Sequence, residues 1–313
     1  MRIAITGGTG FVGRHLAERL LEEGHQVVVL SRRAKGNQRR SGIGEVTCIS
    51  SDLSDVTILT QAFRGCDAIA HCAGINRELG SQTYQHIHIE GTRKVVEAAQ
   101  KAGVRRVALM SFLRARPNCG FPYHESKWAA EEIVRNSRLD YTIIKAGMVY
   151  DRGDHMLDHL SHAIYTVPLL ATVGFRQKPI RPLAVDDLVR VLHAVVVDGR
   201  LPEMTVALTG AEELLLSETV RRVAEVLRRG VLIFPAPVLF HRLLAQVCEW
   251  TMRIPLVAKA QVQILVEGVV EPATPCDPLP NDLLPTRRFT PVEIEHGLPE
   301  MGPFTLGDLR CCA

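Results

Sequence analysis

Short apolar runs alternate with longer segments of helical periodicity through the first half of the chain. The runs have the length of buried strands, and in the longer segments apolar residues recur every three or four positions, as in amphipathic helices. This alternation predicts a parallel sheet with helices on both faces. The predicted strands are residues 2–6, 25–31, 45–52, 67–74, 105–111 and 140–147. The predicted helices are residues 11–24, 56–65, 83–103 and 126–137.

The pattern becomes less regular after residue 150. A helix is predicted at 182–196, a strand at 203–210 and a helix at 216–229, and prolines interrupt the chain beyond residue 230. We expect 182–210 to return to the first sheet, because a further helix and strand continue its pattern. The predicted core therefore comprises residues 1–149 and 182–210, and a smaller substrate-binding lobe comprises residues 150–181 and 211–313.

Composition excludes several classes of protein. A formal net charge of +3 on 313 residues, without a long basic run, gives no reason to expect a nucleic-acid partner. The eight cysteines form no C-x-x-C motif, which is typical of reduced thiols in a cytoplasmic protein. Residues 1–8 lack the apolar region of a signal peptide, and prolines and charges break the apolar stretch at 231–248. We predict no transmembrane segment.

A stripe of five apolar side chains recurs at helical spacing within residues 238–253. The favoured interpretation is a helix packed on its own lobe. The alternative is a surface for a membrane, a quinone-like ligand or a protein partner, which would make the protein peripheral to a membrane or a complex. The members of the stripe are Phe240, Leu243, Leu244, Val247 and Trp250.

Three histidines, His155, His159 and His162, share one predicted helical face. A metal site needs further ligands from outside this segment, and the sequence shows no evident candidate. Polar packing is the favoured interpretation, so no metal is predicted.

The stretch TGGTGFVG, residues 6–13, carries Gly7, Gly10 and Gly13 in G-x-x-G-x-x-G spacing. It lies between the first predicted strand and the first predicted helix, which is the context that gives such a glycine triplet meaning. Glycines there permit a tight turn and close approach of a pyrophosphate, which then meets the free N–H groups of the helix N-terminus. The motif predicts a dinucleotide site.

The end of the second predicted strand distinguishes between two dinucleotides. Enzymes that bind NAD usually carry an acidic residue there for the ribose 2′-hydroxyl. This chain has Ser31, Arg32 and Arg33, and guanidinium groups bind a 2′-phosphate well. The sequence therefore favours NADP(H), with NAD(H) as the alternative. After the third strand, Asp52 and Leu53 are candidates for the adenine, although Asp52 alternatively caps the next helix.

Two tyrosine–lysine pairs have the same spacing but different expected structures. Tyr123 and Lys127 open a predicted helix, where residues four apart are neighbours, about 5–6 Å between Cβ atoms. Tyr141 and Lys145 lie on a predicted strand, where four residues span about 13 Å. Only Tyr123 and Lys127 are therefore predicted to cooperate in transferring one proton. Ser111, at the end of a predicted strand, is predicted to be the third catalytic residue.

The predicted chemistry is a proton transfer to or from the substrate, coupled to hydride transfer to or from the nicotinamide. The Lys127 ammonium should lower the pKa of Tyr123 from its ordinary value near 10. Tyr123 would exchange a proton with a carbonyl or alcohol oxygen that Ser111 orients, while Lys127 also holds the nicotinamide ribose. The alternative is that Tyr123 is a packed helix-entry residue and Lys127 is solvated.

These motifs together resemble the short-chain dehydrogenase/reductase superfamily in its extended or atypical branch. The stretches at 88–111 and 125–154 are similar, more narrowly, to the group related to an accessory subunit of respiratory complex I and to NmrA-like proteins. The resemblance implies a doubly wound Rossmann sheet of about seven strands in the order 3-2-1-4-5-6-7, binding NAD(P)(H). It adds to the expected cofactor contacts Thr9, Phe11, Val12, Cys72, Ala73, Gly74, His88, Ala146, Gly147 and Met148.

The chain departs from the family pattern on the substrate side. His88 stands where many extended members have asparagine, Lys145 precedes Ala146-Gly147 where Arg-Pro-Gly is usual, and Asp151 replaces a common glycine. We therefore expect an NADP(H)-preferring oxidoreductase acting on a small-molecule substrate that the sequence does not identify. The alternatives are a non-catalytic NADP(H)-binding sensor or assembly protein, and an epimerase or dehydratase of a nucleotide sugar.

Overall fold

A computed structural model describes residues 1–32, 38–41, 44–251, 257 and 259–299. The chain divides into two compact units. The first comprises residues 1–146, 185–208 and 271–284, and the second comprises 147–184, 209–270 and 285–313.

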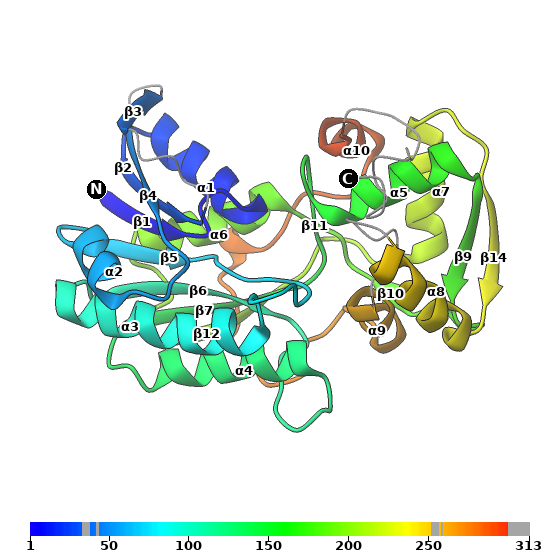
Figure 1. Cartoon of the computed structure of the whole chain (residues 1–313). Helices are drawn as coiled ribbons and strands as arrows, with labels where there is room; N and C mark the ends of the chain where they lie inside the picture. The colour runs from blue at the N-terminus through cyan, green and yellow to red at the C-terminus, as the bar shows by residue number, and fades with distance from the viewer. Residues whose placement is uncertain (33–37, 42–43, 252–256, 258, 300–313) are drawn as a thin grey trace. The chain divides into compact units, whose positions relative to one another are not determined.

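The first unit is built on one eight-stranded sheet (Figure 1). Seven of its strands are parallel and follow the predicted order 3-2-1-4-5-6-7, so the predicted fold class is confirmed. From one edge these are β4 (Gly44–Ser50), β2 (Gln26–Ser31), β1 (Arg2–Thr6), β5 (Ala68–His71), β6 (Arg106–Phe112), β7 (Asp140–Ala146) and β12 (Met204–Leu208). The eighth, β3 (Gln38–Ser41), pairs antiparallel with β4 at the edge and was not predicted.

Two groups of helices cover this sheet. The first group is α1 (Phe11–Glu22) and α6 (Val185–Val196), which contact each other. The second group is α2 (Val56–Phe63), α3 (Gly91–Ala102) and α4 (Pro122–Arg135), in which α3 contacts both neighbours. Apolar strand residues such as Ile69, Val107 and Ile143 are fully buried beneath the second group. This burial is the main source of the unit's stability.

The predicted helix at 83–103 is two elements rather than one. A π-helix, η1 (Gln85–Glu90), precedes α3 directly. Such wide turns in a helix are often found at functional sites. The turn carries His88, a predicted cofactor residue.

The second unit combines three two-stranded pairings with five helices among the described residues. Its helices are α5 (His155–Thr166), α7 (Leu216–Val226), α8 (Val238–Thr251), α9 (Lys259–Glu267) and α10 (Pro291–Gly297). Its strands pair as β8 (Val149–Tyr150) with β11 (Leu183–Ala184), β9 (Leu169–Val173) with β14 (Leu232–Ala236), and β10 (Pro179–Ile180) with β13 (Leu214–Leu215). Its core packs the Tyr150 and Phe289 rings at 4.8 Å between centroids.

The division differs from the predicted one at a proline-rich segment. Residues 271–284 were expected in the second lobe but belong to the first unit. The reason is backbone pairing beside the edge strand β12: Asp277 forms a bridge with Val206, and its carboxylate accepts from the Thr205 N–H at 2.8 Å. Among the described residues, no helix combines the length and apolarity that crossing a membrane requires.

Candidate functional site

The glycine loop has the geometry of a phosphate cradle. The Gly7 N–H donates to the Leu30 carbonyl at 2.9 Å, and Gly7 has a φ of +69°, which favours glycine. Helix α1 begins at Phe11, and its N-cap, Gly10, supplies no side-chain hydrogen bond. The first N–H groups of α1 are therefore available to an anion, and the helix dipole favours one there.

Gly13→Ala is expected to weaken NADPH binding by about tenfold or more. A Cβ at residue 13 would lie 2.4 Å from the Gly7 carbonyl oxygen and 2.8 Å from the Gly8 Cα, so backbone must move. Overpacking of this kind costs about 1 to 3 kcal/mol. Isothermal titration with NADPH measures the effect. Gly230→Ala is the control, since no atom lies within 4 Å of its added Cβ, and unchanged affinity in Gly13→Ala would contradict the cradle.

The expected adenosine end contains an unsatisfied buried hydroxyl. Ser31 ends β2 and is buried, and its Oγ has no hydrogen-bond partner among the described residues. Such a group is stabilised by a ligand that bonds to it. Arg32 follows and is exposed, whereas Arg33 lies outside the described residues. Ser31 and Arg32 therefore fit a polar group on the adenosine ribose.

Asp52 and Leu53 form a structured turn after β4. The Asp52 carboxylate accepts from the Ser54 N–H at 2.9 Å and from the Ser54 hydroxyl, and these bonds lower the pKa of Asp52. Leu53 is buried with a φ of +69°, an unusual conformation for a leucine. The strained turn is held in place, with Leu53 against Gly91 of α3.

The segment after β5 lies between the glycine loop and helix α4, which carries Tyr123 and Lys127. A Cβ on Gly7 would lie 2.7 Å from the Ala73 Cα, and the Cys72 N–H donates to the Thr6 carbonyl at 3.1 Å. At the other side, a Cβ on Gly74 would lie 3.0 Å from the Lys127 Nζ. Residues 72–74 therefore run between the loop and Lys127, along the carboxyl ends of the strands.

His88 ties this segment to the start of α4. Its Nε2 accepts from the Ile75 N–H at 3.1 Å, so its Nδ1 carries the proton and donates to the Ser126 hydroxyl at 2.8 Å. Ser126 in turn donates to the Tyr123 carbonyl at 2.9 Å. Burial and the nearby Lys127 charge lower the pKa of His88 to about 2, so the imidazole is neutral. His88 thus fixes the backbone position of Tyr123.

Tyr123 lies in an aromatic cluster at the entry to α4. Its ring centroid is 5.3 Å from that of Phe112, 5.7 Å from that of Tyr84 and 5.8 Å from that of His88. Burial, and then the neighbouring Tyr84, raise the pKa of Tyr123. The expectation that Lys127 would lower this pKa is therefore wrong for the structure, because desolvation of the phenolate dominates. Tyr123 is a protonated phenol near neutral pH.

Lys127 faces the same edge, one helical turn after Tyr123. Its Nζ donates to the Met110 carbonyl at 3.3 Å, close to the end of β6. Burial lowers the pKa of Lys127 to about 8, and the charge on Glu131 opposes that shift. The side chain is still mostly cationic at neutral pH. It offers a positive charge between Gly74 and the tyrosine.

The third predicted catalytic residue is engaged elsewhere. Ser111 is buried, and its hydroxyl donates to the Glu131 carboxylate of α4. Glu131 is fully buried and pairs with Arg135 at 2.7 Å and with Lys145 at 3.2 Å. The Lys145 Nζ also donates to the Ala115 carbonyl and the Thr274 hydroxyl, each at 2.9 Å. The structure thus ties Ser111 to a buried ion cluster.

The predicted residues near the nicotinamide fall at the end of β7. Ala146 is the last residue of that strand, and Gly147 and Met148 open the second unit. The Met148 carbonyl there accepts from the Leu183 N–H at 2.8 Å.

The comparison with known proteins agrees with this geometry. A family profile described as NAD(P)H-binding matches residues 7–162, which include the glycine loop, segment 72–74 and Tyr123. The chain therefore contains an NAD(P)-binding Rossmann-type domain. Its sheet order and its relatives fit the extended branch of the short-chain dehydrogenase/reductase superfamily.

Three curated relatives of this chain illustrate the range. An uncharacterised Mycobacterium tuberculosis protein is 28% identical over 76% of this chain and 25% of its own length. Ceramide reductase of Caulobacter vibrioides is 33% identical over 49% of this chain and 47% of its own. The NADH-ubiquinone oxidoreductase 40 kDa subunit of Neurospora crassa is 25% identical over 68% of this chain and 57% of its own length. The matched region therefore spans between 25% and 57% of the length of these relatives.

Solved structures share the fold. MoeE5 in complex with UDP-glucose and NAD superposes with a TM-score of 0.68 at 19% identity, covering 95% of this chain and 97% of that one. At this identity the likeness concerns the fold alone.

Two buried polar residues of this region, His71 and Glu131, were not predicted from the sequence. His71 lies between the Thr6 hydroxyl at 2.6 Å and the Thr92 hydroxyl at 3.0 Å, and burial lowers its pKa to about 3. Glu131, which holds Ser111, was also missed. A histidine at the end of a buried strand was the only available signal for His71, whereas Glu131 reads as an ordinary helix-surface residue.

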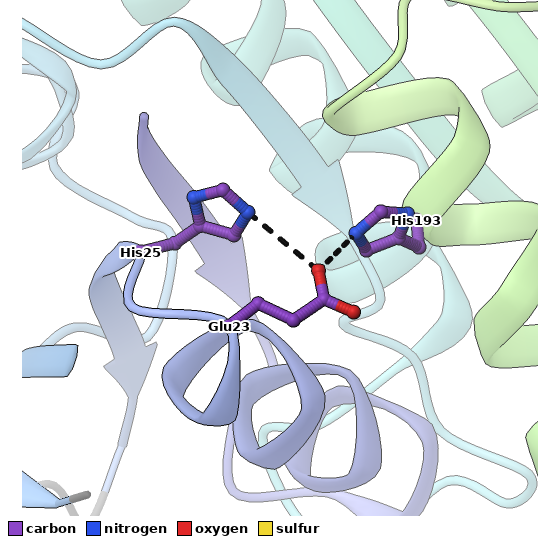
Figure 2. Close-up of side chains that lie close together, drawn as sticks. All are labelled: Glu23, His25 and His193. Atoms are coloured by element: carbon purple, nitrogen blue, oxygen red, sulfur yellow. Dashed lines mark hydrogen bonds and ion pairs between the residues drawn. The ribbon is translucent and has the colours of Figure 1, made fainter. Parts of the chain in front are cut away.

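One cluster of metal-ligating residue types occurs among the described residues, away from this edge. Glu23, His25 and His193 bring their ligand atoms within 4.8 Å of one another (Figure 2). The Glu23 carboxylate bonds to His193 at 2.5 Å and lies 3.7 Å from His25. Its other oxygen accepts from Arg19 at 2.6 Å. Because the Glu23 carboxylate already accepts from the Arg19 guanidinium, we interpret the cluster as a hydrogen-bonded link between α1 and α6 rather than as a metal site.

This link gives a pH-dependent contribution to stability. Burial raises the pKa of Glu23, but bonds and charge from His193 and Arg19 outweigh it and leave the pKa below its ordinary value. A carboxyl with a lowered folded-state pKa stabilises the fold above its unfolded pKa, and that contribution is lost as the pH falls through the folded pKa.

Glu23→Gln is accordingly expected to lower the unfolding free energy at neutral pH by about 0.5 kcal/mol, as for other largely exposed pairs. The difference from wild type should shrink as the pH falls below about 4.5. Urea unfolding at several pH values measures it. A difference that is constant or grows on acidification would contradict this account.

Proposed function

We propose that this chain is an NADP(H)-dependent oxidoreductase that interconverts a carbonyl and an alcohol, with Tyr123 exchanging the proton. The observation that carries the proposal is the continuous edge from Gly7 through Ala73 and Gly74 to Lys127. A dinucleotide whose phosphates rest on α1 would follow this edge to Tyr123. The relative named ceramide reductase supports the reaction class.

The residues of the edge divide the chemistry between them. When bound, the reduced nicotinamide supplies the hydride. The phenol of Tyr123 carries its proton near neutral pH and is assigned as the donor to the carbonyl oxygen; burial raises its pKa, so a bound substrate and cofactor must offset that shift. Lys127 holds a positive charge beside Gly74, where we assign it to the hydroxyls of the nicotinamide ribose. The protonated phenol is the form that the reductive direction uses.

Ser111 enters this proposal in a changed role. Its hydroxyl proton is committed to Glu131, so we assign polarisation of the carbonyl to Tyr123 alone. Ser111 acts as a positioning residue that anchors the end of β6 to α4. Phe112, the next residue, packs on the Tyr123 ring.

The cofactor preference rests on Ser31 and Arg32. An exposed arginine after an unsatisfied buried hydroxyl suits a ribose 2′-phosphate, because a guanidinium donates to phosphate oxygens and offers no acceptor to a ribose hydroxyl. Arg32→Ala should weaken NADPH binding by about tenfold or more and leave NADH binding unchanged, since hydrogen bonds to charged groups contribute about 1.5 to 3 kcal/mol. Calorimetric titration with both cofactors tests this. Arg93→Ala, an exposed arginine of α3, is the control, and parallel losses for NADH would contradict the preference.

Turnover is tested with a panel of ketones, aldehydes, secondary alcohols and sugar nucleotides. The protein is incubated with each compound and NADPH or NADP⁺, and the absorbance of the reduced nicotinamide is followed. We expect cofactor oxidation with at least one carbonyl compound. Tight NADPH binding without any hydride exchange across the panel would contradict the proposal.

A second candidate is a non-catalytic NAD(P)(H)-binding protein. The engagement of Ser111 with Glu131 favours it, because a serine so held does not reach a substrate. The similarity to a respiratory-complex subunit is compatible with it. The same panel discriminates the two, because this candidate binds NADPH but exchanges no hydride.

A further inference from the structure

Helix α8 of the second unit turns its largest side chains outward. Leu239 is 67% exposed, Leu243 61% and Trp250 70%. The sequence stripe was expected to pack on its own lobe, and the structure shows that this interpretation is wrong. The outward apolar residues of α8 are Leu239, Phe240, Leu243, Leu244, Val247 and Trp250.

The opposite side of α8 is already packed. His241, Ala245 and Cys248 are its buried residues. The His241 ring bonds to the Ala171 carbonyl of β9 at 3.1 Å, and Ala245 packs with Val173 and Val262. Helix α8 is therefore held to its unit by His241, Ala245 and Cys248, and its large apolar side chains lie outside the core of this unit.

Exposed apolar side chains also lie on the two paired strands β9 and β14 of the same unit. Strand β14 runs directly into α8 and lies beside β9 (Figure 1). Leu232 and Phe234 of β14, Leu169 of β9 and Phe175 after it are all exposed. Together with the outward residues of α8 they form what we call the apolar face. Exposed apolar surfaces of this extent usually mark an interaction site.

Charge indicates what the apolar face contacts. The two segments that carry it, residues 163–181 and 228–259, contain eight lysines and arginines and one glutamate. The whole chain has 37 basic and 34 acidic residues, so the remainder has 29 basic and 33 acidic residues. Positive charge is therefore concentrated in the two segments that carry the apolar face, in a chain whose remainder is acidic. Of the described basic residues in these segments, Arg181 pairs with Glu213, and the other six are exposed.

We propose that the apolar face docks on the surface of an anionic lipid bilayer. Leucine, phenylalanine and tryptophan on one side of a helix, with basic residues around them, suit insertion at the level of the headgroups. The basic segments add attraction to anionic lipid. A protein partner would need an acidic rim to match, and a second copy of this chain would oppose like charges. The proposal uses no residue of the cofactor edge, so it stands or falls independently of the proposed function.

Co-sedimentation of the full chain with vesicles tests the proposal. The vesicles contain phosphatidylcholine alone or phosphatidylcholine with phosphatidylglycerol. We expect the wild type to bind the anionic vesicles, with weaker binding at high salt and on phosphatidylcholine alone. The double variant Leu243→Glu, Trp250→Glu should bind at least about tenfold more weakly, because it inserts two carboxylates into the contact. Both positions are exposed, so folding is preserved.

Val292→Glu is the matched control, since Val292 is 75% exposed on α10 outside the apolar face. It should bind as the wild type does. Three results would overturn the proposal: no binding of the wild type to anionic vesicles, equal binding by the double variant, or equal loss in Val292→Glu. Light scattering without lipid is run in parallel. A dimer that the double variant dissociates would assign the face to self-association instead.

Discussion

Tyr123→Phe is expected to reduce turnover by about 10² to 10⁴ while leaving the NADPH dissociation constant unchanged. The substitution removes only a hydroxyl. The ring keeps its packing against Phe112, Tyr84 and His88, so the fold and the cofactor edge are retained. The loss should therefore appear in kcat with a substrate found in the panel, while calorimetric titration with NADPH is unaffected.

Two other tyrosines provide matched controls. Tyr141 has the same spacing from a lysine but lies on β7, and Tyr84 contacts Tyr123 while its hydroxyl donates to the Asn76 carbonyl at 2.9 Å. Tyr141→Phe and Tyr84→Phe should each retain activity within about tenfold, since neither supplies the proton. Equal turnover by Tyr123→Phe and the wild type would show that another group transfers the proton.

Glu131→Gln is expected to lower the unfolding free energy by about 3 to 5 kcal/mol, because it leaves the Lys145 ammonium buried without its counter-charge. Glu131 and Lys145 have no exposed side-chain surface. Burial already lowers the pKa of Lys145, and the Glu131 charge opposes that shift. The variant is isosteric, so the loss reports charge rather than volume. Urea unfolding followed by circular dichroism measures it.

The neighbouring glutamate is the control. Glu132 pairs with the same Arg135 but is 45% exposed, so Glu132→Gln should cost less than about 1 kcal/mol. Replacing both buried partners, as Glu131→Leu with Lys145→Met, should recover much of the lost stability. A cost for Glu131→Gln no larger than that for Glu132→Gln would mean that the buried ion cluster does not stabilise the first unit.

The order of the parallel sheet could be predicted because each strand is a buried apolar run and each crossover a periodic helix. The edge strand β3 could not, since its sequence, QRRS, has no apolar alternation. The segment at 271–284 is held by pairing with β12 through Asp277, and its prolines give no periodic signal. Elements whose position depends on one long-range contact are not predicted by local sequence patterns.

The site shows the same contrast. Gly7 and Lys127 could be placed from local motifs, because a turn and a helical spacing fix their geometry. The partner of Ser111 could not, because Glu131 lies 20 residues away and reads as a helix-surface residue. The direction of the Tyr123 pKa shift also depends on burial, which spacing does not reveal. For α8, the pattern indicated an amphipathic helix but not that its wide apolar side is exposed.

A crystal structure of the protein with NADPH tests the central claim most directly. The account predicts the pyrophosphate at the N-terminus of α1, the 2′-phosphate beside Ser31 and Arg32, and the nicotinamide between Gly74 and Tyr123, with Lys127 bonded to its ribose. A nicotinamide ordered away from Tyr123 and Lys127 would contradict the proposed chemistry. A 2′-phosphate with no protein group in reach would contradict the cofactor preference.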